Sequence, residues 1–379
     1  MYDHLRDRDL PPLAALGRAD LSRITGHAGT RLLRLRYQPG ARAILHVALG
    51  SKADAPEGSI WFFAGTKAEK LAQEHPDAQF DPVSGALFQA FPQDHRLPHL
   101  AQFVALAAEY APRLIGGPAR AAPDLMRYRP GLSATFRWTR DDGQVFYVKQ
   151  TAEMRVSAQA QALANLADAA RGRAISFTPV AGLVPDLGLI AYASAPGLPL
   201  EAQMTDAAVA QVLYALRSLW SLPVVPGRVL DRKALLDRAH RAQQLVAPFD
   251  PQAGQCAADL VARLESWTVP VRLRPIHADM KLEHVFLSGR QTTLIDIESL
   301  SLGDPDYDLA ALDARVTMAQ LTGNMTNPGA EAARQQIRKT AGPGYMWFLT
   351  CARLQCARFF AQRLDPATIP ILRQVLADG

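Results

Sequence analysis

This sequence has few cysteines, no long apolar run and no leader-like N-terminus. Its three cysteines cannot form a disulfide framework, and Cys351 and Cys356 match no metal-ligand spacing. No run of about eighteen apolar residues occurs, which excludes a membrane-spanning helix and predicts no membrane partner. The charged N-terminus lacks the apolar core of a signal peptide. We therefore expect a cytoplasmic protein with reduced, buried thiols.

Neither sign of charge dominates the chain. The formal net charge is +5, and 20% of the 379 residues are charged. Lys and Arg are scattered, with no basic run interleaved with aromatics, so we expect no nucleic-acid partner. The small basic surplus suits an anionic small ligand such as a nucleotide. The length is too great for one simple core and predicts two or three subdomains.

Two segments in the first half of the chain begin alike. Arg36-Tyr-Gln-Pro-Gly40 and Arg127-Tyr-Arg-Pro-Gly131 are each followed by two strand-like runs and a helical stretch. Pro-Gly between β-rich runs is a turn signal, so both segments predict strand–turn–strand–helix. After its last aromatic strand the second segment has Lys149, which aligns with Ala64 in the first. A degenerate internal copy and a chance likeness both remain open.

The pattern along the chain predicts three parts. Residues 1–120 are expected to form a cap subdomain, residues 121–196 a β-rich part and residues 197–379 a mostly helical part. Helices are predicted over residues 96–114, 154–170, 204–219, 231–246 and 254–267, with Asp231 as an N-cap.

The candidate catalytic and metal-binding residues are concentrated in residues 276–310. Asp279 lies in a loop before a predicted β-hairpin that turns at Ser288. A hairpin places a residue just before its first strand beside one just after its second. We therefore expect His284 and Asp296 to meet, with Asp279 nearby. Converging carboxylates need a cation or a proton between them, and oxygen-rich surroundings favour Mg²⁺.

This segment resembles the catalytic and metal-binding loops of the aminoglycoside phosphotransferase/choline kinase family. The family pattern is His-x-Asp followed five residues later by Asn, then Ile-Asp-x-Glu, then Gly-Asp-Pro-x-x-Asp-Leu-Ala. The matching elements are His277-Ala-Asp279, Ile295-Asp-Ile-Glu298 and Gly303-Asp-Pro-Asp-Tyr-Asp-Leu-Ala310. The resemblance implies an α+β, two-lobed protein-kinase-like fold. Its β-rich N-lobe would be residues 121–196 and its helical C-lobe residues 197–379, with residues 1–120 as an added α/β cap.

The resemblance also implies ATP- and Mg²⁺-dependent phosphoryl transfer to a small-molecule hydroxyl, with GTP and Mn²⁺ as alternatives. Asp279 would accept or orient the hydroxyl proton, and Lys281 would steady the γ-phosphate. Asp296 would be the main Mg²⁺ ligand, with His284 as the second. The residues implied to support the catalytic loop are His277 and Asp308.

Upstream residues are implied to bind the nucleotide. Lys149 resembles the lysine that pairs with the α- and β-phosphates. Ser133 lies in the turn expected over the phosphates, where its hydroxyl or backbone N–H groups would donate. Backbone groups near Ala193 and Ala195 resemble the hinge that holds adenine.

Two departures from the family pattern keep an alternative open. His284 replaces the family's Asn, and imidazole is a less typical Mg²⁺ ligand than an amide oxygen. The helix after Lys149 offers Gln159 where the family has Glu, although Glu153 is close by. A catalytically weak, pseudokinase-like nucleotide-binding or scaffold protein is therefore the alternative. A protein kinase is disfavoured because no Ala-Pro-Glu element follows Asp296.

The sequence predicts the phosphate acceptor less closely than it predicts the reaction. From Ala311 to the end there are four acidic and eight basic residues, which argues against a strongly cationic substrate. Trp347 and Phe348 are expected to be core residues rather than a stacking surface. The predicted acceptor is a sugar, an amino sugar, an aminoglycoside-like compound or a related metabolite. The oligomeric state is not predicted.

Overall fold

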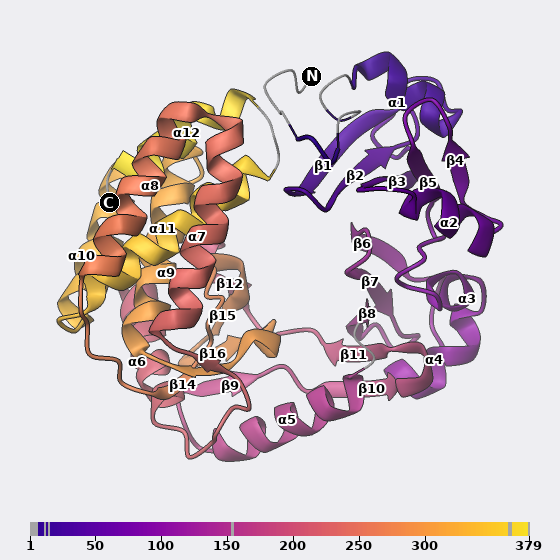
Figure 1. The fold of residues 1–379 in the computed structure, drawn as a ribbon. Helices are drawn as coiled ribbons and strands as arrows, with labels where there is room; N and C mark the ends of the chain where they lie inside the picture. Colours follow the sequence, from indigo (N-terminus) through magenta and orange to yellow (C-terminus); the bar gives the residue numbers. More distant parts are fainter. Residues whose placement is uncertain (1–6, 11–12, 14–15, 153–154, 363–365, 378–379) are drawn as a thin grey trace. The chain divides into compact units, whose positions relative to one another are not determined.

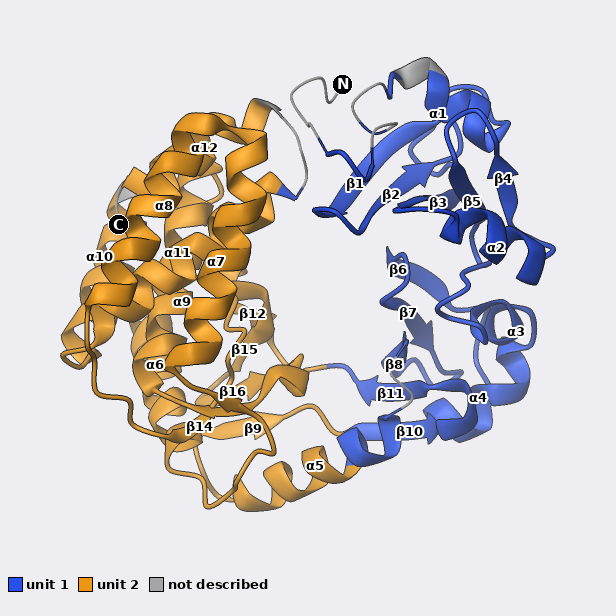
Figure 2. Cartoon of the chain, in the orientation of Figure 1, with its two compact units in different colours: residues 1–160, 180–194, 362–364 blue, residues 161–179, 195–361, 365–379 orange. Residues whose placement is uncertain are grey.

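The structure, a computed structural model, describes residues 7–10, 13, 16–152, 155–362 and 366–377. The chain forms two compact units (Figure 2). The first comprises residues 1–160, 180–194 and 362–364, and the second residues 161–179, 195–361 and 365–379. Among the described residues, no helix is both long enough and apolar enough to cross a membrane. The predicted division at residues 120 and 196 stays a prediction.

The first unit contains two five-stranded antiparallel sheets (Figure 1). The first sheet has the order β1-β2-β3-β5-β4. Its strands are β1 (Arg31–Gln38), β2 (Arg42–Ala48), β3 (Glu57–Phe63), β4 (Gln79–Asp81) and β5 (Ala86–Ala90). Helix α1 (Arg18–Thr25) precedes β1, and α2 (Lys67–Glu74) joins β3 to β4. The fully buried Trp61 and Leu87 belong to a hydrophobic core of this sheet.

The second sheet has the order β6-β7-β8-β11-β10. Its strands are β6 (Asp124–Arg129), β7 (Ser133–Thr139), β8 (Val145–Thr151), β10 (Val180–Val184) and β11 (Leu189–Ala193). Alternate residues of β8 are buried because successive side chains of a strand point to opposite faces. Phe146 and Val148 therefore pack into a core with Trp138 and Phe103.

Three helices are neighbours of this second sheet in the sequence. Helix α5 (Val156–Ala169) follows β8, and α3 (Leu100–Ala105) and α4 (Ala107–Ile115) precede β6. The single helix predicted over residues 96–114 is thus two helices, which meet at Leu106.

In both sheets the five strands, numbered by their sequence order, lie side by side in the order first, second, third, fifth, fourth. In both, a helix follows the third strand in the sequence. Their registers correct the sequence alignment. Thr135 of β7 pairs with Lys149 of β8, and Ile44, at the corresponding place in β2, pairs with Trp61 of β3. Lys149 therefore corresponds to Trp61 and not to Ala64, and it lies inside its strand rather than after it. The alignment was wrong because it matched the aromatic runs that begin at Ile60 and Val145, and Val145 is the first residue of β8 whereas Ile60 is the fourth residue of β3.

The second unit is mostly helical (Figure 1). Its long helices are α6 (Asp206–Trp220), α7 (Arg232–Phe249), α8 (Pro251–Ser266), α9 (Pro305–Leu321), α10 (Asn327–Thr340), α11 (Tyr345–Ala361) and α12 (Ile369–Ala377). Asp231 caps α7 as predicted, because its carboxylate accepts the Ala234 N–H at 2.8 Å. In α11, Trp347 and Phe348 are fully buried core residues. The expectation of buried thiols holds for Cys351 and Cys356, which lie in the same helix, but Cys256 is exposed.

Two small sheets of the second unit position its loops. A four-stranded sheet has the order β12-β15-β16-β9, and a three-stranded sheet has the order β13-β17-β14. The strands are β9 (Ile175–Phe177), β12 (Leu198–Pro199), β13 (Val229–Leu230), β14 (Arg274–Ile276), β15 (Val285–Ser288), β16 (Gln291–Leu294) and β17 (Ser301–Gly303). Strands β15, β16 and β17 lie within residues 276–310, where the sequence concentrates its chemistry, and β14 ends at the first residue of that segment.

Candidate active site

The hairpin of β15 and β16 brings two separated residues to one edge. Val285 pairs with Leu294, and the N–H of Ile295 donates to the carbonyl of His284 at 3.0 Å. This bond extends the pairing beyond the strands, so His284 and Asp296 lie at the same end. Asp296 then leaves the hairpin in the left-handed region, with φ of 57°. The local fold thus places an imidazole and a carboxylate together, as hairpin geometry requires.

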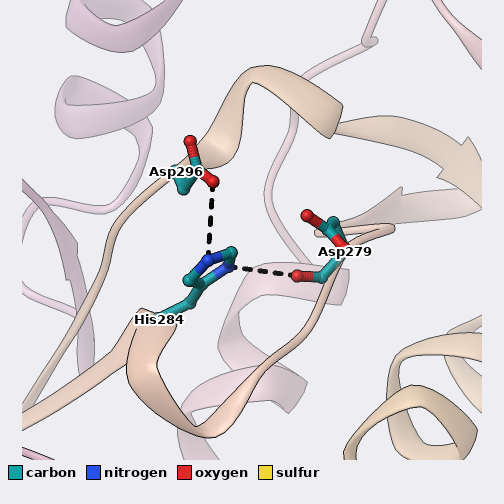
Figure 3. A group of neighbouring side chains, drawn as sticks. All are labelled: Asp279, His284 and Asp296. Atoms are coloured by element: carbon teal, nitrogen blue, oxygen red, sulfur yellow. Dashed lines mark hydrogen bonds and ion pairs between the residues drawn. The ribbon is translucent and has the colours of Figure 1, made fainter. Parts of the chain in front are cut away.

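Three side chains converge at this end (Figure 3). Asp279, His284 and Asp296 each offer one ligand atom, and these atoms all lie within 4.8 Å of one another. The imidazole Nε2 of His284 is 3.4 Å from Asp296 Oδ2, and its Nδ1 is 3.1 Å from the backbone carbonyl of Asp279. The imidazole is buried, while both carboxylates are more than a third exposed. A ligand can therefore reach the carboxylates from solvent.

The protonation of His284 follows from its partners. A backbone carbonyl only accepts hydrogen bonds, so Nδ1 donates and Nε2 of the neutral ring presents a lone pair to the Asp296 carboxylate. Burial, followed by the charge of Lys281, lowers the pKa of His284 to about 4, against the opposing effect of Asp296. Near pH 7 two acceptors therefore face each other across 3.4 Å. Oxygen and nitrogen donors in this arrangement suit a divalent cation between them.

Lys281 is ion-paired in the structure. Its Nζ lies 2.7 Å from Asp279 Oδ2, and its side chain is 19% exposed. It therefore does not extend freely into solvent, and its positive charge lies directly at the carboxylate predicted to be catalytic.

A buried carboxylate holds the loop that contains Asp279. Asp308, in the first turn of α9, accepts the N–H groups of His277 and Ala278, each at 2.9 Å, and the indole N–H of Trp220 at 3.2 Å. Ala278 has a left-handed φ of 64°, and His277 Nε2 lies 3.0 Å from the Ile295 carbonyl. Burial raises the pKa of Asp308, while the two backbone donors favour its charged form. The sequence did not identify Trp220, because no motif links it to Asp308.

Replacing Asp308 with alanine is expected to destabilise the second unit. The change leaves the two buried backbone N–H groups and the indole N–H of Trp220 without their acceptor, which costs about 2–4 kcal/mol of unfolding free energy. Circular dichroism during heating should show a fall in Tm. The Tm of Asp308→Asn, which keeps one carbonyl oxygen, should fall less. An Asp308→Ala protein with the parental Tm would contradict the bracing role.

The predicted phosphate lysine lies in the first unit. Lys149 is half-buried in β8, opposite Thr135 of β7. Gln159 of α5, predicted where the family has an acidic partner for this lysine, donates its amide N–H to the Tyr192 hydroxyl at 2.6 Å. Glu153 lies outside the described residues. The nucleotide roles of Lys149 and Gln159 stay predictions.

The other predicted nucleotide residues are divided between the units. Ser133 is buried at the start of β7, and Ala193 ends β11. Ala195 belongs to the second unit, so the boundary between the units falls inside the segment predicted to be the hinge. The hinge role also stays a prediction.

Comparison with known proteins gives a family and a fold. A model of the phosphotransferase enzyme family matches residues 89–343. The crystal structure of choline kinase LicA from Streptococcus pneumoniae is 13% identical, with a TM-score of 0.53, and the match covers 73% of this chain and 100% of that one. Macrolide 2'-phosphotransferase MphH from Brachybacterium faecium is 14% identical, with a TM-score of 0.46 and coverage of 73% and 97%. No curated protein sequence matches this chain. The LicA match supports the predicted α+β, protein-kinase-like fold, which is thereby confirmed.

Proposed function

Because the chain belongs to the phosphotransferase enzyme family, we propose that it is a kinase that transfers the γ-phosphate of ATP to a hydroxyl of a small molecule. The observation that supports this most is the convergence of Asp279, His284 and Asp296 at one end of the hairpin. Phosphoryl transfer asks chiefly for positioning and for neutralisation of charge, and this set of donors is suited to both.

The nucleotide would be held with a divalent cation. Asp296 and His284 would bind Mg²⁺, with Mn²⁺ as the alternative, and the cation would neutralise charge on the phosphates. Lys149 would pair with the α- and β-phosphates, with the Ser133 hydroxyl donating nearby. Backbone groups near Ala193 and Ala195 would hold adenine, and Gln159 would lie beside Lys149. GTP is the alternative nucleotide.

Asp279 would act on the acceptor. Its carboxylate would orient the hydroxyl and take its proton as the acceptor oxygen bonds to the γ-phosphorus and the bond to the leaving ADP oxygen breaks. Lys281, 2.7 Å from this carboxylate, would offer positive charge to the transferred phosphoryl group. His277 and Asp308 would keep the loop in place.

The acceptor we favour is a neutral sugar or a related metabolite rather than a polycationic aminoglycoside. Arg238 of α7 lies 3.4 Å from the hydroxyl of Tyr307, in the first turn of α9. Burial, followed by the charges of Arg241 and Arg238, lowers the pKa of Arg358. We infer that the acceptor binds beside these helices, where their like charges would repel a cationic substrate.

Thermal-shift titration with ATP and GTP, each with and without Mg²⁺ or Mn²⁺, tests the proposal. A ligand present at about a hundred times its Kd stabilises the native state by about 2.7 kcal/mol, which is readily seen in Tm. A metal-dependent rise in Tm, followed by phosphate transfer to members of a sugar panel, is the expected result. Absence of any shift with every nucleotide would contradict the proposal and favour a protein that acts through another partner.

A further inference from the structure

The two sheets of the first unit are preceded by similar sequences. Asp7-Arg-Asp-Leu-Pro-Pro-Leu13 precedes the first sheet and Asp94-His-Arg-Leu-Pro-His-Leu100 the second, and they share the pattern Asp-x-x-Leu-Pro-x-Leu. The described leucines of both segments, Leu10, Leu13, Leu97 and Leu100, are all buried. The likeness noted between the two Arg-Tyr-x-Pro-Gly turns therefore extends to the segments before them.

Each of these aspartates binds the turn of its own sheet. Asp94 Oδ2 accepts the N–H of Gly131 at 2.6 Å and the hydroxyl of Tyr128 at 2.9 Å. Asp7 Oδ2 accepts the N–H of Gly40 at 2.9 Å and the hydroxyl of the matching tyrosine, Tyr37, at 2.6 Å. One carboxylate oxygen thus fixes a tyrosine and a glycine in both copies.

The two turns differ in what covers them. At Gly131, where φ is +66°, a Cβ atom would lie 2.3 Å from the Trp61 ring and 3.3 Å from Arg96 Cδ. Arg36 of the first sheet also donates to the Pro130 carbonyl at 3.1 Å. Among the described residues, a Cβ atom at Gly40 would meet the Asp9 carboxylate alone, at 3.3 Å. The first sheet therefore encloses the turn of the second.

Of the two turns, the enclosed one at residues 130–133 is the one whose sheet has a lysine close to it. Ser133 follows this turn and lies two residues before Thr135, which pairs with Lys149, so all three side chains share one face of the sheet. In the first sheet the position of Lys149 is the buried Trp61. The N–H groups of Gly131 and Leu132 are already bonded to Asp94 and to the Arg129 carbonyl. With these two N–H groups engaged, we assign the Ser133 hydroxyl as the donor of the turn for a phosphate.

We propose that the first sheet is a copy of the second that now serves as its brace, and that Asp94 is a positioning residue that holds the turn at residues 130–133 for the nucleotide phosphates. This inference rests on the proposed kinase function. Asp94 does not touch the nucleotide in this scheme. It fixes Gly131 and Tyr128, and through them the place of Ser133 relative to Lys149. A preformed turn binds a ligand more tightly because less ordering is needed on binding.

The matched pair of variants is Asp94→Ala and Asp7→Ala, which remove the same bonds from the two copies. Calorimetric titration measures the Kd of each protein for ATP with Mg²⁺ and for adenosine, which lacks phosphates. We expect Asp94→Ala to raise the Kd for ATP about tenfold and to leave that for adenosine unchanged. Asp7→Ala should leave both within about twofold. Asp94→Asn, which keeps one carbonyl oxygen, should recover part of the ATP affinity and serves if the alanine variant does not fold.

The outcomes separate this inference from the function beneath it. Equal effects of the two alanine variants on ATP, or equal losses for ATP and adenosine in Asp94→Ala, would overturn the positioning role alone. A parental protein that binds neither ATP nor GTP with any metal would overturn the proposed function and this inference together.

Discussion

Asp279→Asn is expected to lower kcat about 10²–10⁴-fold while leaving the Kd for ATP with Mg²⁺ nearly unchanged. The amide keeps the size of the side chain but cannot take the proton of the acceptor hydroxyl, and general-base contributions are of this magnitude. The parental carboxylate can be reached by an acceptor from solvent, since its side chain is 39% exposed. Initial rates of ADP release with a sugar acceptor, together with nucleotide titration, measure both quantities.

Glu283→Gln is the matched control for this experiment. Glu283 is an exposed carboxylate in the same short 3₁₀ turn as His284, so the control makes the same chemical change close to the site. It should keep parental kcat. If Asp279→Asn also keeps parental kcat, Asp279 is not the base. If it loses ATP binding and kcat together, its main role lies in the nucleotide site.

Asp296→Ala is expected to abolish the metal-dependent part of nucleotide affinity. With ATP and Mg²⁺ at about a hundred times Kd, the free energy of unfolding of the parental protein should rise by about 2.7 kcal/mol. In the variant, the part of this rise that depends on the metal should be close to zero. The reason is that Asp296 Oδ2 and His284 Nε2 face each other at 3.4 Å, and removing the carboxylate removes the charge that attracts a cation there. Tm measured with and without Mg²⁺ gives the difference directly.

His284→Asn separates the metal site from general damage to the hairpin. The change restores the residue type of the family pattern, and its amide oxygen is a harder ligand than imidazole. We expect metal-dependent stabilisation by ATP to be kept, with a shift in preference from Mn²⁺ towards Mg²⁺. An unchanged metal preference would show that His284 is not a ligand. Retained metal dependence in Asp296→Ala would place the cation elsewhere.

The candidate site was largely predictable because its parts are close in sequence. His284 and Asp296 flank a single hairpin, and the geometry of a hairpin is local, so their meeting follows from the pattern of strand and turn residues alone. The ordered motifs over residues 276–310 also predicted the family that the comparison identifies. The role of Asp308 in holding the loop could be expected for the same reason, since it belongs to one of those motifs.

Contacts across long stretches of chain were not predictable in this way. The match of Lys149 to Trp61 rather than Ala64 depends on loop length and strand register, which single-sequence patterns do not specify. The bond from Trp220 to Asp308 and the bond from Gly131 to Asp94 join distant segments. Neither was visible until packing brought those segments together.

The sequence by itself therefore determined the chemical groups, their local hairpin and the family, because motif spacing and turn chemistry act over a few residues. Only the tertiary structure decided that Trp220 binds Asp308 and that the first sheet encloses the turn of the second. Those arrangements depend on which buried donors and apolar surfaces meet when the whole chain packs. Most buried polar groups find a partner there, wherever in the sequence that partner lies.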